Sequence, residues 1–167
     1  MEYKMNYCPI CGFKLEPKII DKSQVMQCPS CQYIDWNNWV NVSCVVVAYN
    51  NENEFLMVKL KDKEEGKLTF PGGYRDLGET LEEAAKREFF EETGMKLDNL
   101  ELYTTYTKDE QRLVWVVFKA MIDNFNFIEN DEVSEVILIG KNDIINKHLL
   151  RGTLTEALFN TLISERE

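Results

Sequence analysis

Four cysteines in the first part of the chain have the spacing of a metal site. Cys8 and Cys11 form one C-x2-C pair, Cys28 and Cys31 form a second, and the sixteen residues 12–27 separate the pairs. Two such pairs at this separation are typical of a zinc ion held by four thiolates. Two residues between cysteines allow a tight turn to point both sulfur atoms at one ion, and Gly12 permits the positive φ that closes such a turn.

The segment around these cysteines resembles a zinc ribbon, and two other interpretations stay open. The cysteines could form two disulfide bonds or act as redox pairs, although nothing in the sequence points to an oxidising compartment. Structural zinc is favoured because about 35 residues bury too little surface to fold unaided. The fifth cysteine, Cys44, lies in an apolar run and is predicted to be a small buried side chain.

A row of carboxylates lies on a helix that the sequence predicts from about residue 81 to residue 93. Thr80 and Glu83 fit a capping box at the start of this helix, and Gly94 fits a left-handed cap at its end. One stripe along the helix changes from apolar to acidic: Leu81, Ala84, Ala85, Glu88, Glu91 and Glu92. The three glutamates therefore occupy the side on which buried residues are expected.

Like charges at this spacing repel one another, so the acidic row needs a compensating partner. Mg²⁺ or Mn²⁺ would supply it, because hard divalent cations prefer oxygen ligands. A solvated acidic helix face is the alternative that the spacing alone leaves open.

The residues around the acidic row match a family pattern. The 23 residues 73–95 fill every defined position of the Nudix box: Gly73, Glu79, Arg87, Glu88, Phe89, Glu91, Glu92, Gly94 and Met95. The chain thus resembles the Nudix hydrolases. The resemblance implies an α/β/α sandwich with a mixed sheet. It also implies hydrolysis of the pyrophosphate linkage of a nucleoside diphosphate derivative, such as ADP-ribose or NADH/NAD, by metal-assisted attack of water.

The same resemblance implies roles for individual residues. The carboxylates expected to bind Mg²⁺ or Mn²⁺ share the helix stripe: Glu88, Glu91 and Glu92. The Gly72 carbonyl is expected to add a ligand, and Glu79 to be a weaker ligand or to hold the loop against the helix. Arg87 is expected to orient a carboxylate of the row, with an ordinary surface ion pair as the alternative.

A carboxylate must also accept the proton of the attacking water. Glu88 or Glu92 could do so, and so could an acid of the later loop, where several Nudix relatives keep their base. That loop holds four acids: Glu129, Asp131, Glu132 and Glu135. Glu132 is the favoured candidate among them. The single histidine, His148, lies near the predicted last helix, so a histidine-based triad is not expected.

A zinc ribbon ahead of a Nudix domain resembles the NADH pyrophosphatases. Their Ser-Gln-Pro-Trp-Pro type signature is missing, because residues 103–107 read Tyr-Thr-Thr-Tyr-Thr and no proline follows Pro71. ADP-ribose or another nucleotide sugar is therefore supported as well as NADH, with nucleoside triphosphates next. Base stacking and ordinary packing both stay open for five aromatic residues: Tyr74, Tyr103, Tyr106, Trp36 and Trp39. The alternative function is a catalytically weak nucleotide sensor or RNA-binding protein that uses the ribbon for recognition.

Two structural units are needed to position these groups. We expect residues 1–35 to form the zinc ribbon, 36–41 a linker and 42–167 the Nudix domain. Strands alternating with two helices predict an α/β fold. The expected elements after the linker are strands at 42–49 and 55–60, the helix at 81–93, strands near 97–107, 112–121 and 136–139, and a helix near 153–163.

Composition limits the partners. The chain has 167 residues, of which 29 are acidic and 19 basic, for a net charge of −10. Proteins bind nucleic acids and anionic membranes through an excess of Lys and Arg. This chain has an excess of acids, so neither partner is expected. No apolar run approaches bilayer length, and the start lacks the pattern of a signal peptide. We expect a cytoplasmic protein that acts on a small nucleotide, and the resemblance allows a homodimer.

Overall fold

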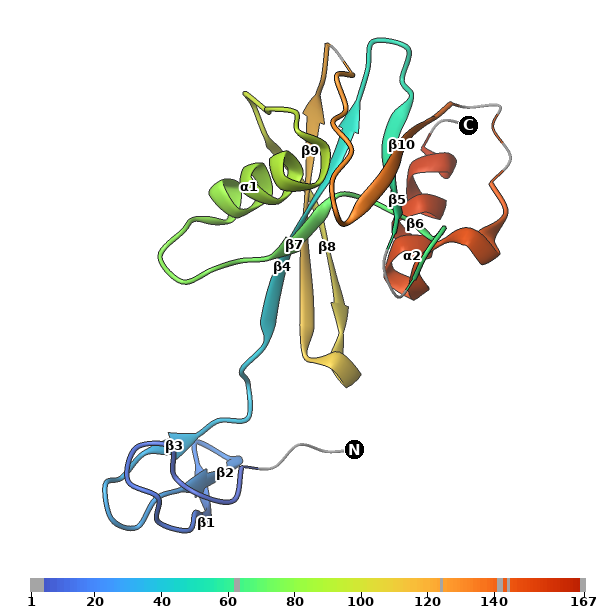
Figure 1. The fold of residues 1–167 in the computed structure, drawn as a ribbon. Helices are drawn as coiled ribbons and strands as arrows, with labels where there is room; N and C mark the ends of the chain where they lie inside the picture. The colour runs from blue at the N-terminus through green and yellow to red at the C-terminus, as the bar shows by residue number, and fades with distance from the viewer. Residues whose placement is uncertain (1–4, 62–63, 124, 141–142, 144, 166–167) are drawn as a thin grey trace. The chain divides into compact units, whose positions relative to one another are not determined.

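The computed structural model describes residues 5–61, 64–123, 125–140, 143 and 145–165. The chain divides into two compact units, Met1–Val40 and Asn41–Glu167 (Figure 1). Each unit has its own sheet and its own buried apolar residues.

The first unit is a small antiparallel sheet beside the four cysteines. Its strands β1 (Glu16–Ile20), β2 (Ser23–Gln27) and β3 (Ile34–Asp35) lie in the order β1-β2-β3. Asp21 and Lys22 connect β1 to β2 with positive φ values of 46° and 69°, the backbone that a two-residue hairpin turn favours. The buried cluster of this unit is small and consists of Cys8, Leu15 and Cys28, with three partly buried side chains packed against it.

The second unit is built on a mixed seven-stranded sheet. Its strands are β4 (Asn41–Tyr49), β5 (Phe55–Leu60), β6 (Leu68–Thr69), β7 (Gly72–Tyr74), β8 (Glu101–Lys108), β9 (Leu113–Met121) and β10 (Val133–Ile139). Five of them follow the order β10-β5-β4-β9-β8, while β6 pairs with β5 and β7 pairs with β4. The neighbours β4 and β9 run parallel, and the other paired strands run antiparallel.

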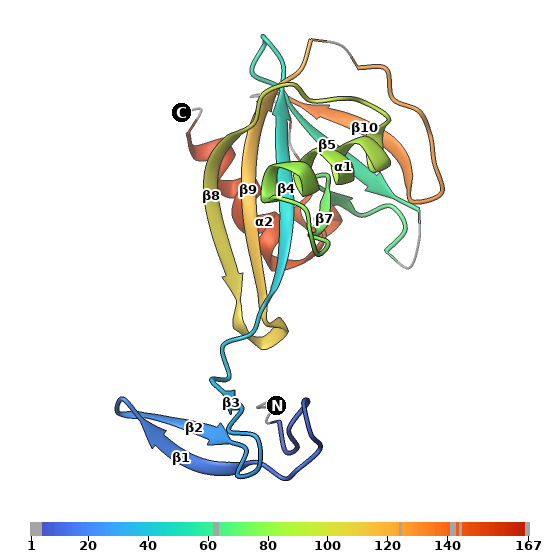
Figure 2. The same ribbon diagram turned by 90° about the vertical axis from the view of Figure 1, so that its left-hand side faces the viewer.

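One helix covers each face of this sheet. Figure 2 shows α1 (Leu81–Thr93) in front of the strands and α2 (Gly152–Ser164) behind them. Cys44, Val46 and Ala48 of β4 pack in the core with α1, whereas Val45 and Val47 pack in the core with α2. Successive strand residues point to opposite faces, so the uninterrupted apolar run 44–48 fits a strand covered on both sides. The predicted α/β/α sandwich with a mixed sheet is confirmed.

The strand ends differ in places from the sequence-based expectation. β10 begins at Val133 rather than at Val136, because a register shift between Val133 and Glu135 carries the pairing with β5 through a polar stretch. β8 begins at Glu101 rather than near Leu97, whose side chain is buried in the connection that follows α1. Two 3-10 turns, Asp109–Gln111 and Lys147–Leu149, complete the described elements. Among the described helices, none has the length and apolar character needed to cross a bilayer.

Candidate metal and catalytic site

The helix α1 has the two capped ends that the sequence predicts. The Thr80 hydroxyl accepts the Glu83 N–H at 3.1 Å, and the Glu83 carboxylate accepts the Thr80 N–H at 2.7 Å. At the other end Gly94 has a φ of 73° and donates its N–H to the Phe90 carbonyl at 2.7 Å. The caps fix where the helix begins and ends, and hence which way its glutamates point.

Two glycines of β7 allow the backbone to lie against β4 and the acidic row. A Cβ on Gly72, which has a φ of 149°, would lie 2.3 Å from the Cys44 carbonyl oxygen. A Cβ on Gly73 would lie 2.4 Å from the Glu88 carboxylate. The Gly72 N–H donates to Glu92 Oε2 at 2.8 Å. Close approach of backbone therefore requires glycine at Gly72, whereas a side chain at Gly73 would displace the Glu88 carboxylate from its position.

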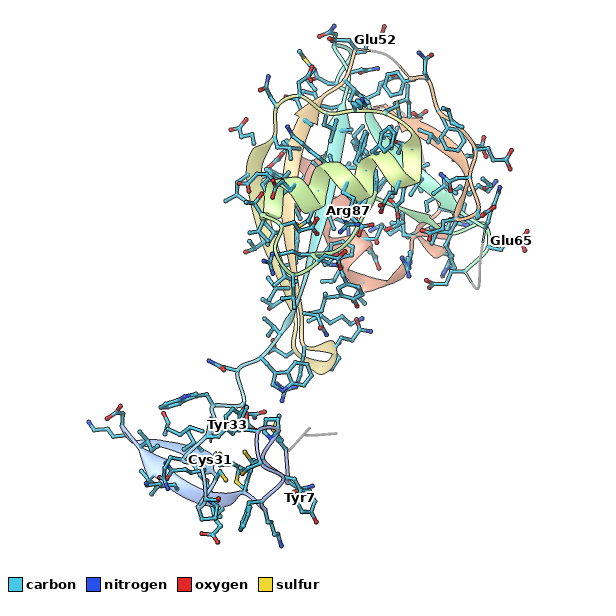
Figure 3. The ribbon with its side chains drawn as sticks, turned by 60° about the vertical axis from the view of Figure 1, so that its left-hand side comes forward. Tyr7, Cys31, Tyr33, Glu52, Glu65 and Arg87 are labelled. Atoms are coloured by element: carbon cyan, nitrogen blue, oxygen red, sulfur yellow. The ribbon has the colours of Figure 1, made fainter. Side chains whose placement is uncertain are left out.

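Arg87, which Figure 3 labels beside α1, binds three of the acids through one guanidinium. Its Nη1 donates to Glu88 Oε1 at 2.7 Å and to Glu91 Oε2 at 3.0 Å. Its Nε and Nη2 donate to the two carboxylate oxygens of Glu79 at 3.1 and 2.8 Å, and Nη2 also donates to the Tyr74 carbonyl at 3.0 Å. These hydrogen bonds from Arg87 lower the pKa of Glu79 to about 2. Arg87 and Glu79 together hold the loop after β7 against α1.

The two more buried acids of the row are costly to ionise. Glu92 is only 9% exposed, and its burial raises its pKa to about 8 although the Gly72 N–H acts in the opposite direction. Burial also raises the pKa of Glu88, and repulsion from Glu91 and Glu132 adds to that effect. A divalent cation would reverse this balance, because it stabilises the ionised form of both carboxylates.

The side chains of the row are of the type that binds Mg²⁺ or Mn²⁺, but their carboxylate oxygens are not gathered around one point in this structure. Three carboxylates on one helix stripe are the oxygen ligands that these ions prefer. Among the described residues, however, only the four cysteines bring their ligand atoms within 4.8 Å of one another. Arg87 binds Glu88 and Glu91, whereas the Gly72 N–H binds Glu92. Gathering the three carboxylates on one ion would require Arg87 to release at least one of them.

The loop before β10 brings one of its acids to the row. Charge repulsion from Glu132 raises the pKa of both Glu88 and Glu92, and Asn130 ties the Glu132 backbone to the end of α1. Glu129 and Glu135 form ion pairs elsewhere, with Lys61 at 2.6 Å and with Lys59 at 3.3 Å. Asn130 joins this loop to the end of α1, a contact between distant segments for which the sequence carries no motif.

A pocket of about 670 Å³ adjoins the two glycines of β7 on the side of the sheet that α2 covers. Aromatic and cationic side chains are among those that line it: Phe70, Tyr74, Trp115, Lys108 and Arg151. Arg151 pairs with Glu64, which also lines the pocket, at 2.5 Å, and its charge lowers the pKa of Glu92. Pockets of this size that combine apolar walls with a few charged groups commonly bind small molecules.

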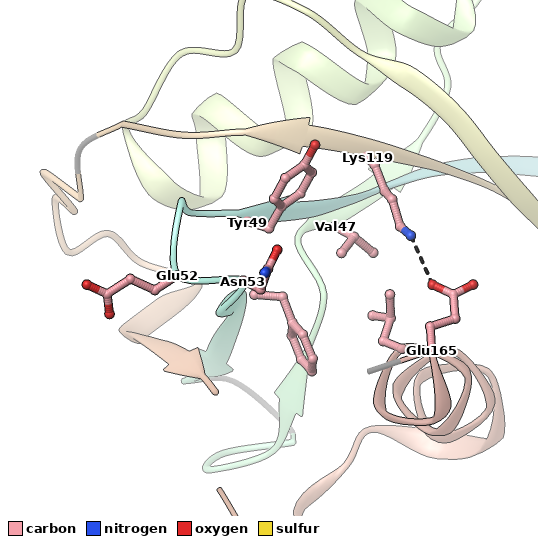
Figure 4. Close-up of a pocket in the computed structure, with 8 residues that line it drawn as sticks. Val47, Tyr49, Glu52, Asn53, Lys119 and Glu165 are labelled. Atoms are coloured by element: carbon pink, nitrogen blue, oxygen red, sulfur yellow. Dashed lines mark hydrogen bonds and ion pairs between the residues drawn. The ribbon is translucent and has the colours of Figure 1, made fainter. Parts of the chain in front are cut away.

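A second pocket, of about 470 Å³, lies at the other end of α2 (Figure 4). Its charged side chains Lys119 and Glu165 bind each other. Lys119 pairs there with Glu165 at 3.1 Å and lies 3.5 Å from the centre of the Tyr103 ring. The Tyr103 hydroxyl donates to Glu165 at 2.5 Å, and the Tyr106 hydroxyl lies 3.1 Å from the Thr161 hydroxyl. These contacts tie β8 and β9 to α2, so Tyr103 and Tyr106 serve packing.

In the first unit the four cysteine side chains converge. All are free thiols, with Sγ–Sγ distances of 3.4 Å for Cys8–Cys31 and for Cys11–Cys28. The disulfide alternative is therefore wrong for this structure. Four thiolates around a tetrahedral zinc ion, each about 2.3 Å from it, would lie about 3.8 Å apart, close to the observed spacing.

Two matching turns carry the cysteine pairs. The Gly12 N–H donates to the Cys8 carbonyl at 2.9 Å, and the Gln32 N–H donates to the Cys28 carbonyl at 3.1 Å. Gly12 has the positive φ that the sequence predicts, and Gln32 adopts the same backbone region without being glycine. The Cys31 N–H points at Cys28 Sγ and lowers the pKa of that thiol to about 7. Backbone N–H groups also lower the pKa of Cys8, whereas hydrogen bonds with the other thiols raise that of Cys31, so the turns favour the thiolate form at the first cysteine of each pair.

Comparison with known proteins agrees with these features. A family model described as the NUDIX domain matches residues 39–157. An NAD-capped RNA hydrolase NudC from Vibrio atlanticus is 32% identical over 104 residues, which cover 62% of this chain and 37% of that protein. The Escherichia coli protein of the same name is 27% identical over 123 residues, which cover 74% of this chain and 46% of that protein. The chain spans less than half the length of these relatives.

Solved structures give a similar result. A NUDIX hydrolase from Nitrosomonas europaea has a TM-score of 0.76 and 27% identity, covering 97% of this chain and 92% of that one. An ADP-ribose pyrophosphatase from Streptococcus suis has a TM-score of 0.61 and 19% identity, covering 77% of this chain and 94% of that one. At that identity the second similarity supports the fold alone.

Proposed function

Since the chain belongs to the Nudix family, we propose that it hydrolyses the pyrophosphate linkage of a nucleoside diphosphate derivative. The observation that carries the proposal is the acidic row of α1, which contacts Arg87 and the β7 glycines, and these glycines also line a pocket with two cationic side chains. Acids alone would repel a diphosphate, so the site needs divalent cations to bind one.

The proposal assigns metal binding to the acids and their orientation to Arg87. Glu88, Glu91 and Glu92 would hold Mg²⁺ or Mn²⁺ with the Gly72 carbonyl, and Glu79 would be a weaker ligand. The metal, when bound, neutralises charge on the diphosphate and lowers the pKa of the attacking water. Arg87 keeps the carboxylates oriented through its hydrogen bonds to the row.

Glu132 is the proposed general base. It belongs to a different segment of the chain that Asn130 ties to the end of α1, so it would face the attacking water without being a metal ligand. Glu88 and Glu92 remain the alternative bases, and replacing each of the three by Gln distinguishes them.

The pocket suggests which substrates to test first. Its volume of about 670 Å³ is in the range that holds small molecules, and Lys108 and Arg151 can contact phosphate oxygens. Tyr74 lines it with 59% of its surface exposed and can stack on a base or nicotinamide ring. ADP-ribose and NADH or NAD are the proposed substrates. The NudC relatives are named for NAD-capped RNA, so a capped oligonucleotide belongs in the same panel.

The four cysteines are proposed to hold a structural zinc ion: Cys8, Cys11, Cys28 and Cys31. The convergence of the four sulfur atoms and the lowered pKa of Cys8 and Cys28 support this assignment. Homodimerisation and a cytoplasmic location stay predictions from the sequence, and light scattering on the purified chain tests the first.

A substrate panel tests the proposed activity. Hydrolysis of ADP-ribose, NADH, NAD, nucleoside triphosphates and an NAD-capped oligonucleotide is followed with and without Mg²⁺ or Mn²⁺ by chromatography of the products. We expect metal-dependent release of a nucleoside monophosphate from at least one pyrophosphate. Glu91→Gln and Glu92→Gln should each lower the rate by roughly 100-fold or more, because each removes a proposed metal ligand.

The outcome separates the two candidate functions. Wild-type rates in both variants would refute the metal assignment. Nucleotide binding without turnover of any panel member would favour the sensor or RNA-binding alternative. The matched control is Glu82→Gln, which changes an exposed acid of the same helix outside the row.

A further inference from the structure

Asn130 uses both ends of its side-chain amide to join two segments of the proposed active site. Its Nδ2 donates to the carbonyl oxygens of Glu91 at 3.1 Å and Glu92 at 2.9 Å. Its Oδ1 accepts the N–H groups of Glu132 at 2.9 Å and Val133 at 2.8 Å. An amide offers two donor hydrogens and two acceptor lone pairs, and these four contacts engage all of them.

The contacts lie where α1 needs a partner. The last carbonyl groups of a helix have no hydrogen-bond donor within the helix, and those of Glu91 and Glu92 belong to the last turn of α1. Asn130 supplies the donors from the loop that carries Glu132. The end of the helix and the start of β10 are thereby fixed relative to each other.

Neighbouring contacts hold the same loop without involving a carboxylate of the site. The Ile128 N–H donates to the Thr93 carbonyl at 3.3 Å, and the Ile128 side chain occupies the space that a Cβ on Gly94 would need, at 3.2 Å. Lys61 donates its ammonium to the Asn130 carbonyl at 2.5 Å and its N–H to the Glu132 carbonyl at 2.9 Å. The loop would therefore stay near α1 without the Asn130 side chain, although less well fixed.

Charge works against this arrangement. Glu132 repels both Glu88 and Glu92, so electrostatics alone would move the Glu132 carboxylate away from the row. The four hydrogen bonds of Asn130 oppose that movement at the residue itself, because one of them is made to the Glu132 N–H.

We propose that Asn130 is a positioning residue that fixes Glu132 relative to Glu91 and Glu92. The inference rests on the proposed function, in which Glu132 accepts a proton at the diphosphate that the row holds. Displacement of a reacting group by about 1 Å can lower a rate by up to 100-fold, so a residue that only sets this position can affect turnover strongly.

Two substitutions separate the two halves of the contact. Asn130→Ala removes all four hydrogen bonds. Asn130→Asp keeps an acceptor for the Glu132 and Val133 N–H groups but loses the donor to the helix carbonyls. Both variants should lower kcat by about tenfold or more with KM within about twofold, because substrate binding is not changed. The matched control, Asn99→Ala, changes an exposed asparagine in the connection between α1 and β8 and should leave kcat unchanged.

A double substitution distinguishes positioning from general loss of stability. In a Glu132→Gln background, Asn130→Ala should lower kcat no further, because the group that it positions is already inactive. Losses that multiply in the double variant, or a wild-type kcat in Asn130→Ala, would overturn the inference.

Hydrogen exchange supplies a readout that needs no substrate. The amides of Glu132 and Val133 should exchange faster in Asn130→Ala than in the wild type, while Asn130→Asp should keep their protection. Unchanged protection in Asn130→Ala would overturn the inference. A wild-type chain that hydrolyses nothing would instead refute the proposed function, and the exchange result would still decide whether Asn130 fixes the loop.

Discussion

The two units of this chain are stabilised by different physical means. Met1–Val40 buries little apolar surface, with Cys8, Leu15 and Cys28 as its cluster, and exposes large apolar side chains such as Ile10 and Ile19. Asn41–Glu167 instead packs apolar layers on both faces of its sheet. We therefore expect the first unit to need the proposed metal ion for stability, whereas the second is stable through burial.

Each unit also gathers groups that repel one another when ionised, and the consequences are opposite. In the first unit, four thiolates around a metal ion would supply most of the stability. In the second, the buried Glu92 and its neighbours lower stability, and the apolar core offsets this cost. Metal removal should thus unfold one unit and leave the fold of the other intact.

Loss of zinc should have the largest effect on stability, and it should affect only the first unit. Cys28→Ser, or chelation of the wild type, should unfold residues 5–35, because a structural zinc ion contributes roughly 10–16 kcal/mol to a small module. The second unit should keep its thermal transition. Metal analysis with two-dimensional NMR checks both statements.

The matched control for zinc loss is the remaining cysteine. Cys44→Ala should lower the stability of the second unit slightly and leave the zinc content unchanged, because Cys44 lies in the α1 core. A folded first unit in a zinc-free sample would show that this unit, like the second, is stable without a metal ion.

A glycine substitution tests how tightly the second unit is packed at its site. Gly72→Ala should destabilise that unit by about 3 kcal/mol or more, since its new Cβ would overlap the Cys44 carbonyl and its φ of 149° is strained for alanine. Gly66→Ala, with a φ of 78° and open space around it, should cost only about 1 kcal/mol. Equal losses for the two variants in urea unfolding would contradict the close packing of β7 on β4.

Local features of the site could be predicted from the sequence because each depends on neighbours within a turn or two. The capping box of Thr80 and Glu83 and the positive φ of Gly12 are confirmed. The prediction that all three glutamates lie on the buried side of α1 is less accurate. Glu92 is buried as expected, but the Glu91 side chain is 56% exposed. A helix advances about 100° per residue, so the Glu91 and Glu92 side chains leave the helix about 100° apart, and here only that of Glu92 points at the sheet.

The contacts between distant segments could not be predicted in this way. Asn130 reaches the end of α1 from a loop about 40 residues later, and its amide bonds the Glu91 and Glu92 carbonyls there. Which donor meets which acceptor there depends on the packing of β10 and α1 in the folded sheet. Sequence patterns describe one element at a time and do not contain that information.

The pH dependence of stability tests the cost of burying Glu92. Its pKa is raised from about 4.5 to about 8, so the folded state favours the protonated form. The stability from this group is fully present below pH 4.5 and is lost as the pH rises through 8. At pH 8.5 metal-free Glu92→Gln should therefore be more stable than the wild type by on the order of 2 kcal/mol.

Thermal melts of both proteins at pH 4.5 and pH 8.5 measure this effect. Added Mg²⁺ should reduce the difference at pH 8.5 by stabilising the wild type, and Glu82→Gln serves as an exposed control. Identical pH profiles for the wild type and Glu92→Gln would show that the buried acid is not a cost to the second unit.

The smallest expected effect concerns the cap of α1. Thr80→Ala removes the hydroxyl that accepts the Glu83 N–H and should cost about 1 kcal/mol in urea unfolding, whereas Thr80→Ser should keep the cap. The loss is small because Ala84, Ala85 and Phe89 hold the helix in the core independently of its end. A loss as large as that of Gly72→Ala would mean that α1 depends on its cap more than on burial. The second unit would then resemble the first in depending on a few polar groups more than on apolar burial.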